Sequence, residues 1–247
     1  MTETPRPPRA VVVMPLYNEA ATLAEVLDEV RRHTAARIVV VNDGSTDGSA
    51  AILAAAEARL ADVHVLTHAV NEGYGQSLID GFRYAVDGEF DIAVTIDCDR
   101  QHEPRLIPEF LAAARRFDIV SGSRYHPEAP GAQDDPAPPD RQRLNEEITR
   151  IVNELTGFRL TDAWCGFKAY RVTGLARMRL DEPSYGLPLQ VWLQAARLGL
   201  TVAEIPVPRI YKNPERRFWG GLDDPQARRT YYLTIIDREV SRWRTSS

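Results

Sequence analysis

The sequence predicts an α/β fold with a Rossmann-like, doubly wound and mostly parallel sheet flanked by helices. In the first half of the chain, runs of β-branched residues alternate with segments whose apolar residues recur at helical spacing, which is typical of βαβ units. The 247 residues, of which 44% are hydrophobic and 26% charged, suffice for one large domain with a sizeable core. We therefore expect a single domain over residues 1–247.

The first half supplies most of the expected sheet, because each of its strands is a short apolar run between polar turns. Strands are expected at residues 10–14, 37–42, 63–67, 92–96 and 118–121. Helices are expected between them, at residues 22–32, 47–60, 76–86 and 104–115.

The second half has fewer strands and ends in a helix. Further helices are expected at residues 141–157 and 185–198, and extended segments at residues 167–171 and 201–205. Residues 223–244 should form an amphipathic helix, with Asp223 or Asp224 as its cap and Pro225 in an early turn. We expect this helix to pack on the domain, on a second subunit of a homodimer, or on a membrane surface.

Two segments are expected to lack regular structure. Residues 1–9 are polar and proline-rich, so they should form a disordered tail. Residues 126–140 (HPEAPGAQDDPAPPD) hold five prolines among acidic and small residues, which predicts a mobile loop. Because long loops inside compact domains are often lids, we expect this loop to order over an active site when ligands bind.

Charge and cysteine content exclude several classes of protein. The net charge of −5 is unsuited to general nucleic-acid binding, so no nucleic-acid partner is expected. Cys98 and Cys165 form neither a disulfide framework nor the spacing of a zinc site. Since we find no secretory signal and no apolar run of about 20 residues, a cytoplasmic protein is expected, with peripheral contact at the inner face of the membrane as a further option.

Polar residues follow the first, second and fourth expected strands. Ligands of open α/β sheets bind beyond the carboxyl ends of the strands, so these residues are the candidate site. Tyr17 either stacks on a nucleobase or is a half-buried aromatic, and Asp43 either holds a base or ribose or belongs to a turn. Glu19 either lines the site or favours the start of a helix.

Two carboxylates, Asp97 and Asp99, follow the fourth strand at positions i and i+2. They repel each other unless a cation lies between them. Mg²⁺ and Mn²⁺ prefer oxygen ligands and are commonly shared between a few carboxylates and substrate phosphates. We therefore expect Mg²⁺ or Mn²⁺ at this strand end, with Gln101 as a further oxygen ligand. His102 either binds a softer ion or supports the turn.

Six blocks of the sequence occur in an order that resembles a known family. They are residues 12–19 (VVMPLYNE), 41–49 (VNDGSTDGS), 71–81 (NEGYGQSLIDG), 95–104 (TIDCDRQHEP), 122–124 (GSR) and 161–171 (TDAWCGFKAYR). The chain resembles the family-2 glycosyltransferases over residues 10–210, and within them the dolichyl- or polyprenyl-phosphate mannosyltransferase-like branch. The resemblance implies a GT-A fold and an inverting hexosyltransferase. Its expected donor is a GDP- or UDP-sugar, with mannose or glucose as the sugar, and its expected acceptor is a polyprenyl or dolichyl phosphate.

The same resemblance assigns roles to individual residues. The donor nucleotide would be bound by Pro15, Tyr17, Glu19, Asp43 and Asp97. The metal would be held by Asp97, Asp99 and Gln101. The acceptor phosphate would be bound by Arg124, Arg141, Arg143 and either Arg216 or Arg217. The candidate catalytic residues are Asp99, Asp162 and Arg124.

Two departures from the family pattern bear on these roles. Tyr74 stands where many relatives have a lysine, so a cationic donor contact is missing or replaced there. Residues 211–224 (YKNPERRFWGGLDD) differ from the Gly-x-Ser-Lys pattern associated with lipid-phosphate acceptors.

Other functions are therefore considered beside the lipid-phosphate one. The alternative acceptor is a hydroxyl on a glycan or small molecule, and Asp162 would then be the general base that takes its proton. Without that role Asp162 is a cap or turn acid. Trp164 and Phe167 either form a platform for the sugar or pack in the core, and core packing is favoured. A nucleotidyltransferase is disfavoured because residues 15–19 are neither glycine-rich nor basic, and a catalytically silent scaffold is disfavoured by the three acidic strand ends.

Overall fold

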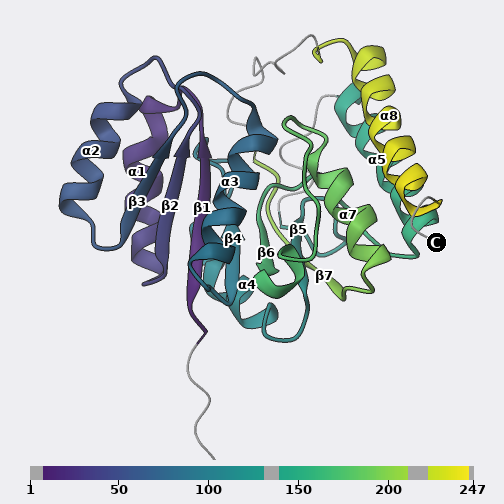
Figure 1. Cartoon of the computed structure of the whole chain (residues 1–247), viewed down its shortest axis with the longest axis horizontal. Coiled ribbons are helices and arrows are strands. Elements are labelled where there is room, and N and C mark those ends of the chain that lie inside the picture. The colour runs from purple at the N-terminus through teal and green to yellow at the C-terminus, as the bar shows by residue number, and fades with distance from the viewer. Residues whose placement is uncertain (1–7, 131–138, 211–221, 245–247) are drawn as a thin grey trace, which may run out of the picture.

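The computed structural model describes residues 8–130, 139–210 and 222–244, and in them it contains a seven-stranded sheet of order β3-β2-β1-β4-β6-β5-β7 (Figure 1). The strands are β1 (Ala10–Leu16), β2 (Arg37–Asn42), β3 (Val63–Thr67), β4 (Ile92–Thr95), β5 (Ile119–Ser123), β6 (Lys168–Arg171) and β7 (Val202–Pro206). β6 runs antiparallel to its neighbours β4 and β5, and the other pairings are parallel. The predicted α/β class with a mostly parallel, doubly wound sheet is confirmed.

Helices cover both faces of this sheet. They are α1 (Ala20–His33), α2 (Ser49–Arg59), α3 (Tyr74–Asp87), α4 (Ile107–Ala113), α5 (Pro139–Thr156), α6 (Val172–Leu175), α7 (Leu187–Arg197) and α8 (Pro225–Arg244), with a 3₁₀ turn, η1 (Pro104–Leu106), before α4. Figure 1 shows α1 and α2 at one side of the molecule and α5 and α8 at the other.

The alternation of side chains along β1 explains the two layers. Val12 and Met14 point to one face, where they join the core formed with α1, α2 and α4. Val11 and Val13 point to the other face, where the core includes α3, α5, α7 and α8. Because successive side chains of a strand face opposite ways, a strand covered on both sides reads as a continuous apolar run. All four residues have no solvent exposure.

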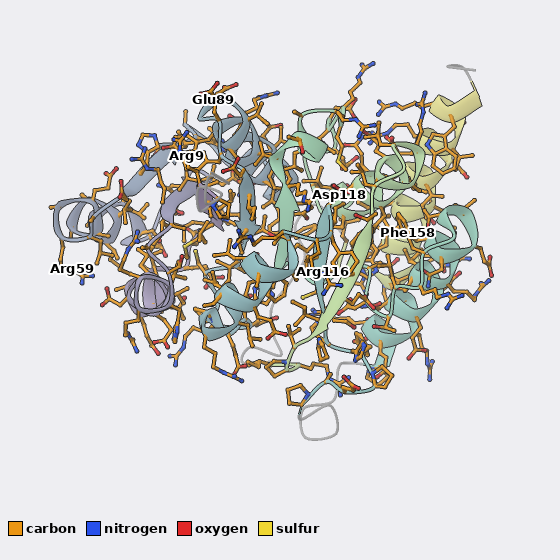
Figure 2. All side chains as sticks on the ribbon, turned by 90° about the horizontal axis from the view of Figure 1, so that it is seen from below. Arg9, Arg59, Glu89, Arg116, Asp118 and Phe158 are labelled. Carbon is orange, nitrogen blue, oxygen red and sulfur yellow. The ribbon has the colours of Figure 1, made fainter. Side chains whose placement is uncertain are left out.

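The structure corrects the expected boundaries of two segments. Pro139 and Asp140 fall within the expected loop 126–140 but begin α5, which suits proline because its fixed φ matches a first helical turn. Arg9 falls within the expected tail, yet its N–H donates to Asp91 Oδ2 at 2.7 Å. Its guanidinium donates to the carbonyl of Glu89 at 3.2 Å, and Figure 2 labels both of these residues. The expectations for residues 1–7 and 131–138 lie outside the described residues. The short helix α6 was not predicted, because four residues are too few to show a helical period.

The terminal helix α8 packs against α5 and α7 of the same chain. Its Tyr232, Ile235 and Ile236 are buried, and Glu239, which is 1% exposed, accepts hydrogen bonds from Gln190 Nε2 at 2.8 Å and another glutamine of α7. The expected helix at residues 223–244 is thus present, and it contacts the domain. In the described part of the chain, no helix has the length and apolar character needed to cross a membrane.

Gly81 of α3 lies so close to β1 that a substitution there tests the contact between helix and sheet. A Cβ on Gly81 would lie 2.2 Å from Val13 Cγ1. Alanine in place of glycine favours a helix by about 1 kcal/mol, but overpacking a core costs about 1–3 kcal/mol. Since Val13 lies in a central strand and cannot move away, we expect Gly81→Ala to lower the free energy of unfolding, as measured by urea denaturation. Adding Val13→Ala should make the cost of Gly81→Ala smaller, and a single variant at least as stable as the parent would contradict the expected clash.

Candidate active site

The residues after β1, β2 and β4 meet at one edge of the sheet and line a pocket that we call pocket A. Its lining residues are Pro15, Leu16, Tyr17, Glu19, Asp43, Asn71, Gly73, Tyr74, Ser77, Asp97, Cys98, Asp99, Ser184 and Tyr185. All five residues expected to bind a nucleotide are among them. The carboxyl ends of the parallel strands therefore bring these side chains together, as the topology of an open α/β sheet requires.

Hydrogen bonds between the loops after β1 and β2 fix the shape of this edge. Asn18 adopts a left-handed backbone conformation with φ of 55°, which asparagine tolerates better than most residues. Its N–H donates to Ser45 Oγ at 3.0 Å, and its Oδ1 accepts from the N–H of Thr46 at 2.8 Å. Asp47 accepts from the backbone N–H groups of Ala20 and Ser49, each at 2.9 Å, and so joins the beginnings of α1 and α2.

A second pocket, pocket B, adjoins the first and is lined by side chains from both halves of the chain. Its lining residues are Tyr74, Asp97, Asp99, Gln101, His102, Arg124, Tyr125, Arg141, Leu144, Asn145, Trp164, Gly166, Tyr185, Pro188, Arg228 and Tyr232. Tyr74, Asp97, Asp99 and Tyr185 line both pockets and so mark the border between them. The rings of Tyr74 and Tyr185 stack there with centroids 6.0 Å apart.

The turn after β4 presents the carboxylates at this border. Gln101 donates its N–H to Asp99 Oδ1 at 3.0 Å, and the N–H of Asp97 donates to His102 Nδ1 at 3.2 Å. Arg100, between them, has a φ of 63°, an uncommon conformation of the kind that clusters at functional sites. Burial lowers the pKa of His102, against the opposing charge of Asp97. A neutral ring whose Nδ1 accepts a backbone N–H supports the turn, which was one of the two expected roles.

The side chains at the border suit a hard divalent cation. Two carboxylates and an amide oxygen, from Asp97, Asp99 and Gln101, line pocket B together, and such oxygen ligands are those that Mg²⁺ and Mn²⁺ prefer. A Cβ on Gly166 would lie 2.7 Å from Asp97 Oδ2, so glycine leaves this carboxylate the room it needs. In the described residues no group of three histidine, cysteine, aspartate or glutamate side chains could hold a metal by itself. Oxygens of a bound ligand would have to complete the shell.

Three arginines from separate elements line pocket B. Arg124 follows β5, Arg141 lies in the first turn of α5, and Arg228 comes from α8. The side chain of Arg228 is 3% exposed and donates to Asp140 Oδ2 at 3.1 Å. Arg143 is exposed and does not line the pocket. Arg216 and Arg217 lie outside the described residues.

Arg228 and Tyr185 are site residues that sequence reasoning missed. Arg228 is one of several arginines on a terminal helix, and only the packing of α8 against α5 brings it to the pocket. Tyr185 precedes α7 without any motif. Tyr74 was noticed only as a departure, yet its hydroxyl donates to Asp97 Oδ1 at 3.1 Å. A neutral hydrogen-bond donor thus stands where many relatives have a lysine.

Asp162 is buried behind Arg124 and is not exposed to solvent. Arg124 donates from Nε to Asp162 Oδ2 at 2.7 Å and from a terminal nitrogen to Oδ1 at 3.0 Å. Asn145 Nδ2 and the N–H of Trp164 also donate to Oδ1, each at 3.0 Å. Burial alone would raise the pKa of Asp162, but the charge of Arg124 and these hydrogen bonds lower it to about 2. A carboxylate so enclosed and so weakly basic is poorly suited to be the general base expected for a hydroxyl acceptor.

The two aromatic residues considered as a sugar platform lie in different places. Phe167 is fully buried and stacks on Phe110 with centroids 4.1 Å apart, so it packs in the core as favoured from the sequence. Trp164 is only partly buried and lines pocket B, where its ring lies 4.2 Å from that of Tyr232. Core packing is therefore confirmed for Phe167, whereas Trp164 packs against the edge of the core and also lines pocket B.

Comparisons with known proteins agree with this geometry. Residues 11–178 match the model of the family described as glycosyl transferase family 2. An undecaprenyl-phosphate mannosyltransferase from Micrococcus luteus is 30% identical over 219 residues, which cover 87% of this chain and 89% of that protein. A polyprenol monophosphomannose synthase from Mycolicibacterium smegmatis is 30% identical over 207 residues, which cover 81% of this chain and 76% of that protein.

Solved structures show the same fold at lower identity. The crystal structure of glucosyl-3-phosphoglycerate synthase from Mycobacterium tuberculosis, in complex with Mn²⁺, UDP and glucosyl-3-phosphoglycerate, has a TM-score of 0.71 at 20% sequence identity. The alignment covers 94% of this chain and 80% of that chain. Together with the family match, this likeness confirms the predicted GT-A fold.

The pair of Arg124 and Asp162 predicts how stability depends on pH. A carboxyl whose pKa is lower in the folded state stabilises the fold above its unfolded pKa, and this contribution is lost as the pH falls through the folded value. We expect Asp162→Asn to lower the free energy of unfolding by about 3 kcal/mol near pH 7, because it leaves the mostly buried side chain of Arg124, 18% exposed, without its counter-ion. The difference from the parent should shrink between about pH 4 and pH 2. Chemical denaturation at a series of pH values measures it, and a difference that stays constant with pH would contradict the assignment.

Proposed function

Because the chain belongs to glycosyl transferase family 2, we propose that this glycosyltransferase moves a hexose, mannose or glucose, from a GDP- or UDP-sugar to a polyprenyl phosphate. The observation that carries the proposal is the meeting of Arg124, Arg141 and Arg228 in a pocket that adjoins the carboxylates Asp97 and Asp99. Guanidinium groups bind phosphate oxygens through charge-assisted hydrogen bonds. In this chain of net charge −5, three of them at one pocket suit an anionic acceptor.

The donor would occupy pocket A and reach the border with its sugar. Tyr17 and Asp43, which line pocket A but not pocket B, are candidates to contact the nucleobase, and Asp97 and Asp99 to contact the diphosphate. The sugar would then lie beside the stacked rings of Tyr74 and Tyr185, facing pocket B. The acceptor would approach from the opposite side of the anomeric carbon, and the family resemblance implies inversion there.

The residues present fit a divalent ion, which Asp97, Asp99 and Gln101 would hold, as the sequence motif suggested. Bound Mg²⁺ or Mn²⁺ supplies Lewis-acid stabilisation of the charge that develops on the departing diphosphate. The hydroxyl of Tyr74 orients Asp97 through its hydrogen bond at 3.1 Å. The polar groups at the border between the two pockets therefore come from the turn after β4 and from the start of α3.

A phosphate acceptor needs no general base, because its oxygen is already ionised. Arg124, Arg141 and Arg228 would position that oxygen, and Asp162 would hold Arg124 in place through its two hydrogen bonds at 2.7 and 3.0 Å. This role suits the buried, weakly basic Asp162 better than proton abstraction from a hydroxyl acceptor does. Since the polyprenyl tail stays in the bilayer, the proposed enzyme works at the membrane surface, on its cytoplasmic side.

Removal of one metal ligand tests the donor half of the proposal. The acceptor in this assay is undecaprenyl phosphate, and the donor is whichever of GDP-mannose, GDP-glucose, UDP-mannose and UDP-glucose supports turnover by the parent. With these substrates we expect Asp99→Asn to lower kcat by about 100- to 1,000-fold. Binding of a fluorescent nucleoside diphosphate should also lose its stimulation by Mn²⁺. Asp28→Asn is the matched control, because Asp28 lies on α1 and pairs with Arg59 at 2.6 Å. Metal-stimulated binding that survives in the Asp99 variant would overturn the assignment.

Two arginines in the same turn of α5 test the acceptor half. We expect Arg141→Ala to raise the KM for the lipid phosphate by about 10- to 100-fold, because it removes charged hydrogen bonds to the phosphate. The KM for the sugar nucleotide should change little. Arg143→Ala is the control, since Arg143 is exposed and does not line pocket B. Equal effects of the two substitutions on steady-state kinetics would contradict the proposed acceptor site.

A further inference from the structure

A histidine that lies behind pocket A joins two carboxylates. His68 directly follows β3, and its side chain is 11% exposed. Its Nδ1 lies 2.7 Å from Asp43 Oδ1, and its Nε2 lies 3.1 Å from Asp80 Oδ2. The backbone N–H of His68 donates to the carbonyl of Asn42, the residue before Asp43, at 2.9 Å. Backbone and side chain of His68 are thus both fixed against the loop after β2.

Both ring nitrogens of His68 face acceptors, and this determines its charge state. A neutral imidazole carries one N–H, so it can donate to one carboxylate only, whereas the imidazolium donates to both. Burial by itself lowers the pKa of His68, but the hydrogen bond and charge of Asp43 and the charges of Glu72 and Asp80 outweigh burial and raise it. Arg83 pairs with Asp80 at 2.8 Å and adds a positive charge to this cluster.

Three donors hold the carboxylate of Asp43, which also lines pocket A. Its Oδ1 accepts the N–H of Glu72 at 2.7 Å as well as the His68 ring, and its Oδ2 accepts the N–H of Gly73 at 2.9 Å. Asp43 is 3% exposed and lines pocket A. A carboxylate with one remaining accepting direction is suited to a single N–H group of a nucleobase, such as the imide of uracil or the N1–H of guanine.

We propose that the His68 imidazolium is a positioning residue that holds the Asp43 carboxylate toward an N–H of the donor nucleobase, so that donor affinity falls when His68 loses its proton. The inference rests on the proposed function, because it needs a nucleotide in pocket A. After deprotonation the ring keeps one N–H, and its lone pair faces one of the two carboxylates. If it faces Asp43, that carboxylate turns away from its bonds to residues 72 and 73. If it faces Asp80, Asp43 still loses the attraction of the positive charge, so its position is held less firmly in either tautomer.

Nucleotide affinity as a function of pH tests the inference. Dissociation constants for UDP and GDP with Mg²⁺ are measured by calorimetry between pH 6.5 and pH 8.5 on the full chain and three variants. We expect His68→Gln to weaken binding about three- to tenfold at pH 6.5. The ratio of the dissociation constants of variant and parent should approach one as the pH rises. Ionisation of the ligand itself affects both proteins equally and cancels in this ratio. His64→Gln is the matched control, because His64 lies on β3, the strand that ends just before His68, is exposed and stacks on Tyr84.

Asp80→Asn tests whether the charge of His68 matters. If His68 had only a structural role, this substitution would not shift the pH at which nucleotide affinity falls. Loss of one neighbouring negative charge makes the imidazolium easier to deprotonate, so the fall in affinity should move to lower pH while Asp43 stays intact. NMR titration of the ring in the nucleotide-free protein should place its midpoint above about 6.5, the ordinary value, and lower in the Asp80 variant. This titration remains decisive if His68→Gln fails to fold.

The role of His68 and the proposed function fail on different outcomes. Suppose that the parent binds nucleotide and that His68→Gln shows the same dissociation constants at every pH. This outcome would overturn the role of His68 and leave the proposed function standing. A ring titration with its midpoint below the ordinary value would do the same. If neither the parent nor the His64 control bound a nucleotide at any pH, the proposed function would fail and the inference with it.

Discussion

The ion pair between Arg124 and Asp162 holds the second half of the site together. Two hydrogen bonds join the groups, at 2.7 and 3.0 Å, and Asn145 of α5 adds a third to the same carboxylate. Glu204 of β7 fixes the loop that contains Asp162. Its carboxylate accepts hydrogen bonds from the N–H groups of Thr161 and Asp162 at 2.8 and 3.1 Å. A buried charge without such partners would cost several kcal/mol. The end of β5, α5 and β7 are therefore fixed relative to one another by the hydrogen bonds of two carboxylates, Asp162 and Glu204.

The acidic residues at the sheet edge differ in how their charge is balanced. Asp162 is paired with Arg124, and Asp43 with His68, and both carboxylates are almost completely buried. Asp97 and Asp99 instead line both pockets, where Asp97 accepts from the Tyr74 hydroxyl and Asp99 from the N–H of Gln101. Two neighbouring carboxylates at the border of two pockets are stabilised by a divalent ion between them. The division between buried ion pairs and pocket-lining carboxylates matches the proposed roles of support and catalysis.

Much of the fold follows from local pattern, and the exceptions have physical causes. The apolar runs that form β1, β2 and β4 were expected because a strand covered on both faces must be apolar throughout. β2 ends at the expected residue, whereas β1 continues two residues further to Leu16 and β4 ends one residue earlier at Thr95. The antiparallel direction of β6 has no local signal, since strand direction depends on which neighbours a segment meets. Pro139 illustrates a conflict between composition and position: a proline-rich stretch predicts a loop, yet its last proline begins α5.

The sequence by itself determined the α/β class, the three polar strand ends and the pair Asp97 and Asp99, because residue type and spacing along one segment carry that information. Only the tertiary structure decided that Arg141 and not Arg143 reaches pocket B, that Arg228 joins it from α8, and that His68 lies behind Asp43. These are relations between elements far apart in the chain. They depend on helix rotation and on packing across the sheet, and neither is encoded in any single window of residues.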